Sequence, residues 1–396
     1  MSTATYKAEI AWTADPGLVA RIGTWQIGVH RLGGGVSESD WTDETANVKA
    51  ASIRRGRSGD LGVIMRGTCD LTLNDFDGTY NPANTGSTLY PHVVPMRPVR
   101  ITANFNGTDY RRFYGYIQRI RHYPNASRQE TVIECADLFA WLEADYPVIA
   151  AMGATDTGAA IESVLKASSV ADSSMYDLDT GDTLSDFSAD GSQTALNLIQ
   201  KLVEAERGTF YASREGKAVF EDRNARYVSP RNADQSTLTN TMSDLAAETD
   251  AFMIYNHITA TRTGGVAQTS EDVSSQHSYA RRPLSLTSDY WVDDAQAADC
   301  AGYIMGMSSA PKTPVSLEIV NGDDARLTAM LARDLNDRVG VSETRGSTSG
   351  SYHIESIDER ISDGGKLHRA SWRLSRLDRM PFIIGSAQID RAFITY

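Results

Sequence analysis

The sequence predicts a mainly β fold in which a mixed α/β segment separates two β regions. Short runs of alternating apolar and polar residues, bounded by turn residues, fill the first 145 of the 396 residues and return after residue 251. Between these regions, apolar residues recur at helical spacing. We therefore divide the chain into four parts: 1–145, a first β domain; 146–250, a mixed α/β insert domain; 251–380, a second β domain with a helix; and 381–396, a C-terminal docking tail.

Six runs in the first part alternate as half-buried strands do. They are 5–13, 25–31, 66–73, 99–105, 110–119 and 128–135. Asn106-Gly107 separates two of the runs and predicts a tight hairpin turn. Asp-Gly and Asn-Pro pairs after the run 66–73 are further turn signals. We expect the residues of these turns to shape one loop of a β-barrel or sandwich: Asn74, Asp77, Gly78 and Pro82.

The middle part contains three predicted helices, at 137–144, 157–168 and 192–206. The third is the clearest, because five apolar residues form one stripe along it. They are Ala195, Leu196, Ile199, Leu202 and Val203. We expect Ser192 or Gln193 near its N-terminal cap and Gly208 at its end. The segment 169–191 is rich in Ser, Asp and Thr and is predicted as loop, and Glu215-Gly216 predicts a hairpin.

The last part begins with an alternating run at 254–260 and a predicted helix at 293–307. Four further strands are predicted at 315–319, 338–342, 351–361 and 367–375. The C-terminal tail is unusually apolar, and an exposed apolar segment is typical of an association surface. We expect four of its residues to dock on a neighbouring subunit: Phe382, Ile383, Ile384 and Phe393.

Composition excludes several classes of protein. Hydrophobic residues make up 41% of the chain and charged residues 22%, which is ordinary globular usage and argues against a disordered chain. The net charge of −13 argues against a protein that holds nucleic acid through its phosphates. The three cysteines form no CxxC pair, so we expect reduced thiols and no zinc or iron–sulfur site. Neither a signal peptide nor an 18-residue apolar run is present, so we expect a protein of the cytoplasm without a membrane span.

The motif search predicts no catalytic, cofactor or metal site. The seven histidines form no HExxH motif, and GxSxG is absent. The triplet 33–35, Gly-Gly-Gly, is read as a flexible loop because no phosphate-binding motif surrounds it. The carboxylates of 74–78 fit either a hairpin turn or a calcium ion, and the turn is favoured because no EF-hand spacing follows. Arg54-Arg55-Gly56-Arg57 fits either a solvated turn or an arginine clamp on a partner.

Several of these segments together resemble tail hub (minor tail) proteins of long-tailed bacteriophages. The resemblance starts at Arg55-Gly56-Arg57 and Gly67-Thr68, runs through 71–82, and continues in 97–101 and 113–117. The helix 195–206, the following hairpin and the closing strands also fit, so the resemblance covers most of the chain. No single segment is as specific as a zinc signature, and the order of the segments carries the resemblance.

The resemblance implies a phage baseplate-hub fold: two tail-tube-like β-barrel domains with smaller mixed domains attached. It implies a homotrimer whose six barrels form a pseudo-hexameric ring that continues the tail tube and adapts sixfold to threefold symmetry. The implied partners are a distal tail protein ring, a tape measure protein and a tip or fibre protein. Phage DNA would cross the lumen without specific binding, which suits an acidic chain.

Two other functions stay open: a carbohydrate-binding tail protein that recognises the host surface, and a tail-associated cell-wall hydrolase. On the hub interpretation, Arg54, Arg55 and Arg57 are candidates for subunit or ring contacts. The protein is then expected in the virion, at the tail tip or baseplate, after assembly in the bacterial cytoplasm.

Overall fold

The computed structural model describes residues 2–14, 36–57, 62–125, 127–168, 170, 173–249 and 253–376, together with the backbone of 380–381 and 392–393. The predicted strand 25–31, the Gly-Gly-Gly triplet 33–35 and the tail residues Phe382, Ile383 and Ile384 lie outside these ranges. Phe393 falls in β25 (Ala392–Phe393), which pairs with β24 (Met380–Pro381), and only its backbone is described.

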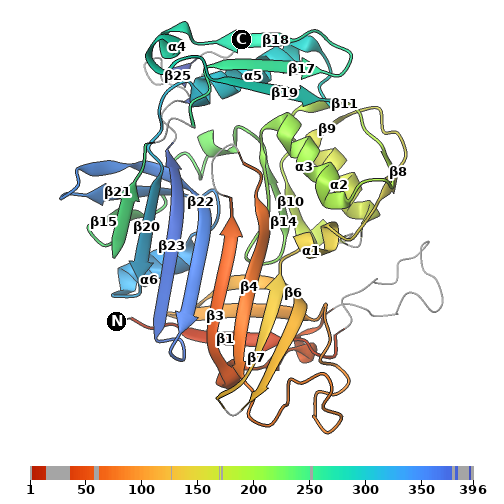
Figure 1. Cartoon of the computed structure of the whole chain (residues 1–396), viewed down its shortest axis with the longest axis vertical. Coiled ribbons are helices and arrows are strands. Elements are labelled where there is room, and N and C mark those ends of the chain that lie inside the picture. The colour runs from red at the N-terminus through yellow and green to blue at the C-terminus, as the bar shows by residue number, and fades with distance from the viewer. Residues whose placement is uncertain are drawn as a thin grey trace.

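The first β region contains seven strands of one large antiparallel sheet (Figure 1). They are β1 (Thr5–Ile10), β2 (Thr42–Asp43), β3 (Val48–Gly56), β4 (Met65–Asn74), β5 (Pro98–Phe105), β6 (Thr108–Asn125) and β7 (Arg128–Ala136). Their spatial order is β3-β4-β7-β6-β5-β1-β2. The predicted turn at Asn106-Gly107 joins β5 and β6, and both residues have the positive φ that such a turn requires.

The second β region contributes the other six strands of this 13-stranded sheet. They are β15 (Thr237–Thr239), β16 (Asp244–Ala247), β20 (Val315–Val320), β21 (Arg338–Glu343), β22 (Thr348–Ser362) and β23 (Leu367–Arg376). Strands β15 and β16 precede residue 251, so the end of the predicted insert 146–250 also belongs to this sheet. The two regions join where β22 pairs with β3, from Ser356 opposite Gly56 to Ser362 opposite Ala50. The mainly β fold is confirmed, and the two regions share one unbroken sheet.

Each β region encloses its own apolar core. In the first, β3, β4 and β7 pack against β1, β5 and β6 around the buried side chains of Trp12, Leu71 and Phe113. In the second, β20, β22 and β23 pack around Trp372, Ile354 and Val339. Helix α6 (Asp324–Ala332), which the sequence did not predict, begins with Asp323 as its N-cap. Its residues Leu327 and Leu331 pack on Ala4, Ala103 and Phe105 of the first region.

The middle of the chain forms a mixed α/β unit with a separate core. Its helices are α1 (Phe139–Leu142), α2 (Thr157–Ala167) and α3 (Ala195–Glu206), and the hairpin of β13 (Thr209–Ala212) and β14 (Ala218–Glu221) follows them. The third helix is confirmed, but its cap is Thr194, whose side chain accepts a hydrogen bond from the amide of Asn197. The segment predicted as loop contains β10 (Tyr176–Leu178), β11 (Thr183–Asp186) and β12 (Ala189–Asp190). These short strands pair with β14, β9 (Ala154–Asp156) and β8 (Val148–Ile149), respectively.

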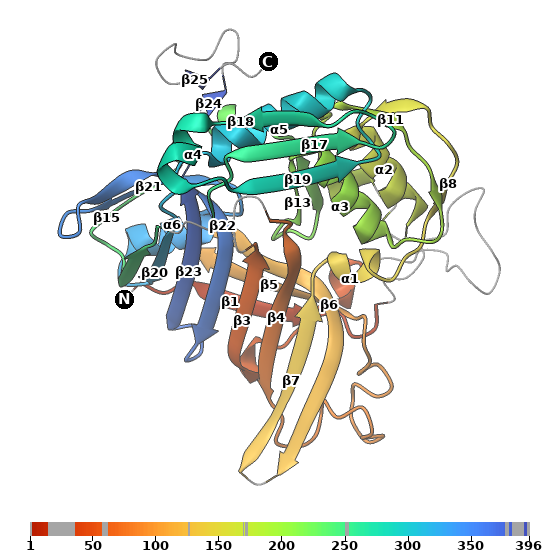
Figure 2. The ribbon, with the colours of Figure 1, turned by 45° about the horizontal axis from the view of Figure 1, so that its top comes forward.

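The structure divides the segment 251–380, predicted as one β domain, between two sheets. Its first part forms a separate three-stranded sheet of β17 (His257–Arg262), β18 (Gln268–Glu271) and β19 (Pro283–Ser288), seen at the top of Figure 2. Helix α5 (Asp294–Ser308) covers one face of this sheet through Ala297, Ala301 and Ile304, and α4 (Val273–Tyr279) lies at its end. After α5 the chain returns to the large sheet at β20.

Candidate assembly surface

The most extensive functional candidate is one face of the large sheet. Eight strands lie side by side in the order β16-β20-β23-β22-β3-β4-β7-β6, and alternate side chains point away from the two cores. We call this surface the polar sheet face. Its half-buried or exposed residues are Asp244, Ser316, Glu318, Arg369, Ser371, Arg373, Ser356, Asp358, Arg360, Ser52, Arg54, Thr68, Asp70, Glu134, Arg119 and Arg121. The core-facing layer with β1 lies behind β3 and β4 in Figure 1.

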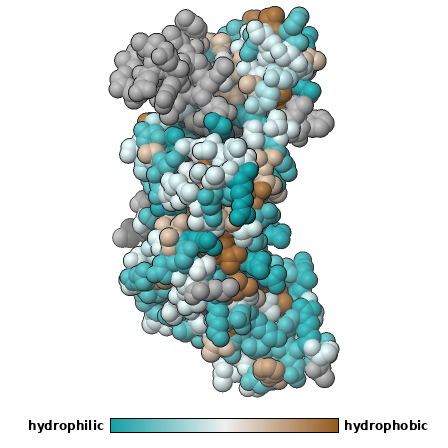
Figure 3. All heavy atoms as spheres, turned by 90° about the vertical axis from the view of Figure 1, so that its left-hand side faces the viewer, coloured by the Kyte–Doolittle hydropathy of each residue, from teal (hydrophilic) through white to brown (hydrophobic). Residues whose placement is uncertain are grey.

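Charges of both signs alternate across the polar sheet face. Arg54 of β3 lies 3.5 Å from Asp358 of β22, and Arg369 lies 3.4 Å from Glu318. The surface seen from the side of β20 and β21 is mostly hydrophilic with isolated apolar patches (Figure 3). Exposed ion pairs of this kind contribute about 0–1 kcal/mol each, so they do not hold the sheet together. The face is therefore suited to contact with water.

A buried ionic cluster, which we call the inter-region clamp, ties the two β regions together on the opposite side of the sheet. The guanidinium of Arg112 in β6 donates to both carboxylate oxygens of Glu359 in β22, one of them at 3.1 Å, and to the carbonyl oxygen of Leu331 in α6 at 2.6 Å. His368 lies 3.1 Å from Glu359. Burial raises the pKa of Glu359, but Arg112 and His368 outweigh it, so the pKa lies well below its ordinary value.

A second cluster joins the end of β3 to the second region and to the middle unit. Glu355 accepts hydrogen bonds from Arg57 at 2.6 Å and from Ser375, and Arg226 lies 2.7 Å from its carboxylate. Although burial opposes it, the charges of Arg226 and Arg57 lower the pKa of Glu355 well below its usual range. The Glu355 carboxylate is therefore charged at neutral pH and is held by two arginines.

These contacts correct the expectation for the arginine segment 54–57. Arg54 and Arg55 lie within β3 and not in a solvated turn. Arg55 is buried and pairs with Asp334, and Arg57 is buried against Glu355, so both side chains have partners within the chain. Arg54 alone remains accessible, with 76% of its side chain exposed on the polar sheet face. Of the three candidates for subunit or ring contacts, Arg54 is the one whose side chain is exposed.

The expected loop residues lie after β4. Asn74 ends this strand, and Asp77, Gly78 and Pro82 lie in the connection to β5. Asp77 accepts hydrogen bonds from the amide and hydroxyl groups of Thr79, and Gly78 has a φ of +73°. Asp75 points instead to the buried hydroxyl of Thr131. The two carboxylates of this motif thus stabilise different parts of the loop.

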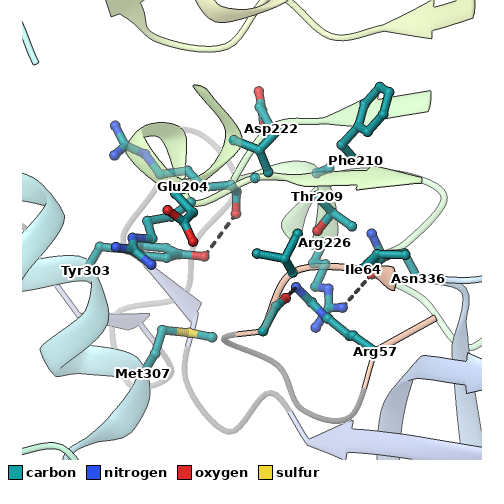
Figure 4. A pocket seen from close by; sticks show the side chains of 17 residues that line it. Arg57, Ile64, Glu204, Thr209, Phe210, Asp222, Arg226, Tyr303, Met307 and Asn336 are labelled. Carbon is teal, nitrogen blue, oxygen red and sulfur yellow. Dashed lines mark hydrogen bonds between the residues drawn. The ribbon is translucent and has the colours of Figure 1, made fainter. Parts of the chain in front are cut away.

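A small pocket of about 70 Å³ lies between the first β region, the middle unit, α5 and the second β region (Figure 4). Arg57 and Ile64 come from the first region, Thr209 from the middle unit, Tyr303 from α5 and Asn336 from the second region. Dashed lines in Figure 4 mark the hydrogen bond from Arg226 to Asn336 and the one from the Tyr303 hydroxyl to the carbonyl oxygen of Arg223. These two bonds connect elements that are far apart in the sequence, so the pocket lies at a structural junction.

Within the described ranges, no three His, Cys, Asp or Glu side chains converge as a metal site would require. The described helices also include none with the length and apolarity that a membrane crossing needs.

Glu206, at the end of α3, makes the stability of the middle unit depend on pH. Its buried carboxylate accepts hydrogen bonds from the amide of Asp182 at 2.7 Å and the hydroxyl of Thr157 at 3.0 Å. Burial, together with the charge of Asp182, raises its pKa from 4.5 to about 7. Folding therefore favours the protonated form, so this contribution to stability is complete below pH 4.5 and is lost as the pH rises to about 7.

We expect Glu206→Gln, which cannot ionise, to remove this loss. The free energy of unfolding of the variant relative to the unchanged chain should increase by on the order of 3 kcal/mol between the two pH values. Urea unfolding in steps from pH 4.5 to pH 7 measures it. Asp137, whose pKa burial also raises to about 7, remains in both proteins and cancels in the difference. A constant difference across this range would contradict the assignment.

Solved structures of tail proteins share this architecture. A tail protein from Neisseria meningitidis MC58 matches with a TM-score of 0.61 at 11% identity, over 95% of this chain and 97% of its own. The 43 kDa tail protein of prophage MuSo2 from Shewanella oneidensis matches with a TM-score of 0.56 at 16% identity, over 84% of this chain and 94% of its own. The fold is that of a phage tail protein.

The tail-protein fold also extends beyond these two structures. A chain of the Francisella PdpA–VgrG complex matches over 94% of this chain and 52% of its own, with a TM-score of 0.51 at 8% identity. No protein-family model and no curated protein sequence matches the chain. At these identities the likeness establishes the tail-protein fold and leaves the function to be argued from the surfaces described above.

Sequence reasoning missed both the inter-region clamp and the polar sheet face of the tail-protein fold. Arg112 and Glu359 are 247 positions apart in the chain, and each stands in an ordinary strand pattern. The sequence did contain one indication. A charged residue that a strand pattern places toward the core must have a buried partner, so such a residue predicts an ion pair with a distant part of the chain. Arg112 lies next to Phe113, and both are buried, which interrupts the alternation of β6.

Proposed function

We propose that this chain is a structural tail hub protein, three copies of which form a ring that continues a phage tail tube. The observation that carries the proposal is the polar sheet face. The second β region supplies four of its strands, β16, β20, β23 and β22, and the first supplies the other four, β3, β4, β7 and β6. One chain thus resembles two tube subunits side by side, and three chains would present the six equivalent sectors that a sixfold tube needs.

In this ring, the polar sheet face lines the channel. Its serine, threonine and paired charges hold water and present no uniform positive field, and the whole chain carries a net charge of −13. Phage DNA is expected to pass without specific binding, because phosphate contacts need a surplus of cations. A distal tail protein ring, a tape measure protein and a tip or fibre protein are the expected partners in the virion tail, after assembly in the bacterial cytoplasm.

We propose no enzymatic activity for this chain. The buried carboxylates Glu355 and Glu359 are already occupied by arginines, so they are unsuited to act as acids or bases on a bound substrate. Trp12, Trp291 and Trp372 are buried and cannot stack on a sugar, and the exposed aromatic side chains Phe76, Tyr146 and Tyr279 lie on different connections and helices of the chain. These features favour the hub over a hydrolase or a carbohydrate-binding protein.

The test is the solution mass of the purified chain by analytical ultracentrifugation, followed by electron microscopy of the particles. We expect a species of three subunits that forms an open ring with a channel along its axis. A chain that remains monomeric at concentrations up to about 100 µM, both alone and with a distal tail protein ring, would argue against the hub. A closed trimer without a channel would retain self-association but exclude a tube.

A further inference from the structure

The polar sheet face ends in two strand edges that no other described strand covers. At one end, β16 pairs only with β20, from Asp244 opposite Glu318 to Ala247 opposite Val315. At the other end, β6 pairs with β7 from Tyr116 to Asn125, whereas its other side is covered by β5 and the residues just before it only as far as Ile117, whose amide and carbonyl groups bond to Arg97 and Met96. Beyond Ile117, one side of β6 is an edge within the described ranges. Uncovered edges present unpaired amide and carbonyl groups that pair readily with another strand.

The two edges carry opposite charge. On β6, Arg119 and Arg121 are 62% and 47% exposed, and they share a single carboxylate, Glu134 of β7, at 3.8 and 2.5 Å. The free edge of β6 itself, from Gln118 to Asn125, thus carries these two cations and no carboxylate. Two exposed cations at alternate positions of an edge strand also keep identical edges from pairing with each other.

On β16, Asp244 stands directly opposite Glu318 of the neighbouring strand, and both belong to the polar sheet face. Like charges at directly opposite positions destabilise a strand pair. Arg369 lies 3.4 Å from Glu318 and offsets its charge, and Asp244 is the only charged residue of β16. The two edge strands thus carry charges of opposite sign.

Strand direction also fits a junction between these two edges. Every pairing along the path from β16 to β6 is antiparallel. Because the path contains eight strands, β6 runs opposite to β16. A second copy, related by rotation about an axis along the channel, would therefore bring its β16 antiparallel to β6 of the first copy. The sheet would continue without a change of pattern, and a cyclic ring would leave no edge uncovered.

We propose that β6 of one copy pairs with β16 of the next, with Arg119 and Arg121 facing Asp244 across the junction. The inference rests on the proposed trimeric hub and names the strands and charges that close it. Backbone hydrogen bonds hold the junction, and the charges select the heterologous pairing of β6 with β16 over the pairing of two like edges.

A charge-reversal series tests this junction by sedimentation velocity on the full chain. We expect Asp244→Arg alone, and Arg119→Glu with Arg121→Glu, each to weaken trimer formation at least about tenfold, because like charges then meet. The chain with all three substitutions should regain trimer affinity, since it restores opposite charges at every junction. Arg360→Glu, an exposed cation in the middle of the polar sheet face, is the matched control and should leave assembly unchanged.

Covalent trapping gives a second measurement. The natural cysteines, Cys69, Cys135 and Cys300, are buried, so a chain with Arg121→Cys and Ala246→Cys carries its accessible thiols only at the two edges. Oxidation should produce disulfide-linked trimers on a denaturing gel. If the charge-reversed chains form trimers as tightly as the unchanged chain, and the double-cysteine chain forms trimers that do not cross-link, this junction is wrong. The proposed hub would not be affected by that result. A wild-type chain that does not trimerise under any condition above would overturn both.

Discussion

Glu359→Leu is expected to lower the free energy of unfolding by about 3–5 kcal/mol, because it leaves the Arg112 guanidinium buried without a counter-charge. The side chain of Arg112 is fully buried, and Glu359 accepts from it through both carboxylate oxygens. The contact joins β6 of the first region to β22 of the second, beside α6, so its loss weakens the connection between the two halves. Urea unfolding followed by tryptophan fluorescence measures the change.

The neighbouring residue provides a matched control. Asp358 lies on the same strand but faces the polar sheet face, where it pairs with the exposed Arg54 at 3.5 Å. Asp358→Leu should cost less than about 1 kcal/mol, because an exposed pair contributes little. The double variant Arg112→Met with Glu359→Leu removes both charges and should recover much of the loss. Equal costs for Glu359→Leu and Asp358→Leu would contradict the role of burial.

Local patterns predicted the individual strands and helices well. The hairpin of β5 and β6 follows from Asn106-Gly107, because these residues adopt positive φ readily and the flanking strands alternate. Helix α3 follows from its apolar stripe, which became part of the middle core. These elements are determined by residues close in sequence, so one sequence suffices to predict them.

Elements that depend on distant partners were not predicted. Strand β3 consists largely of small and charged residues, 49–52 and 54–56, and it is a strand because β4 and β22 lie on either side of it. The short strands of 176–190 form against β8, β9 and β14 in the same way. Helix α6 has only nine residues and is stabilised by the first β region. In each case tertiary packing supplies the free energy that local propensity lacks.

The candidate assembly surface could not be predicted from the sequence for the same reason. Its side chains come from eight strands whose order in space differs from their order in sequence, and their register is set by pairings such as Arg54 opposite Asp358. The sequence did indicate that Arg54, Arg55 and Arg57 form contacts. It could not indicate that two of them are satisfied inside the chain, because their partners, Asp334 and Glu355, lie about 280 and 300 positions away.

Gly56→Ala is expected to disrupt the joint between the two β regions. Gly56 ends β3 with a φ of +111°, a conformation that residues with a Cβ atom rarely adopt. An added Cβ would lie 2.1 Å from the carbonyl oxygen of Glu355 and 2.5 Å from Cα of Ser356, both on β22. Strain in φ and a forced backbone shift should together cost about 2–5 kcal/mol. Thermal and urea unfolding measure this cost, and hydrogen exchange should show faster opening of β3 and β22.

Gly107→Ala separates the two causes. Gly107 also has a positive φ, +78°, but an added Cβ there meets no atom within 4 Å. Its cost should therefore be that of φ strain alone, about 1–2 kcal/mol, without faster exchange in β22. If Gly56→Ala costs no more than Gly107→Ala, then β3 and β22 are not in close backbone contact at this point. If it costs more and also abolishes trimers, an unbroken sheet across both β regions is a requirement of the ring, because Gly56 lies away from both proposed edges.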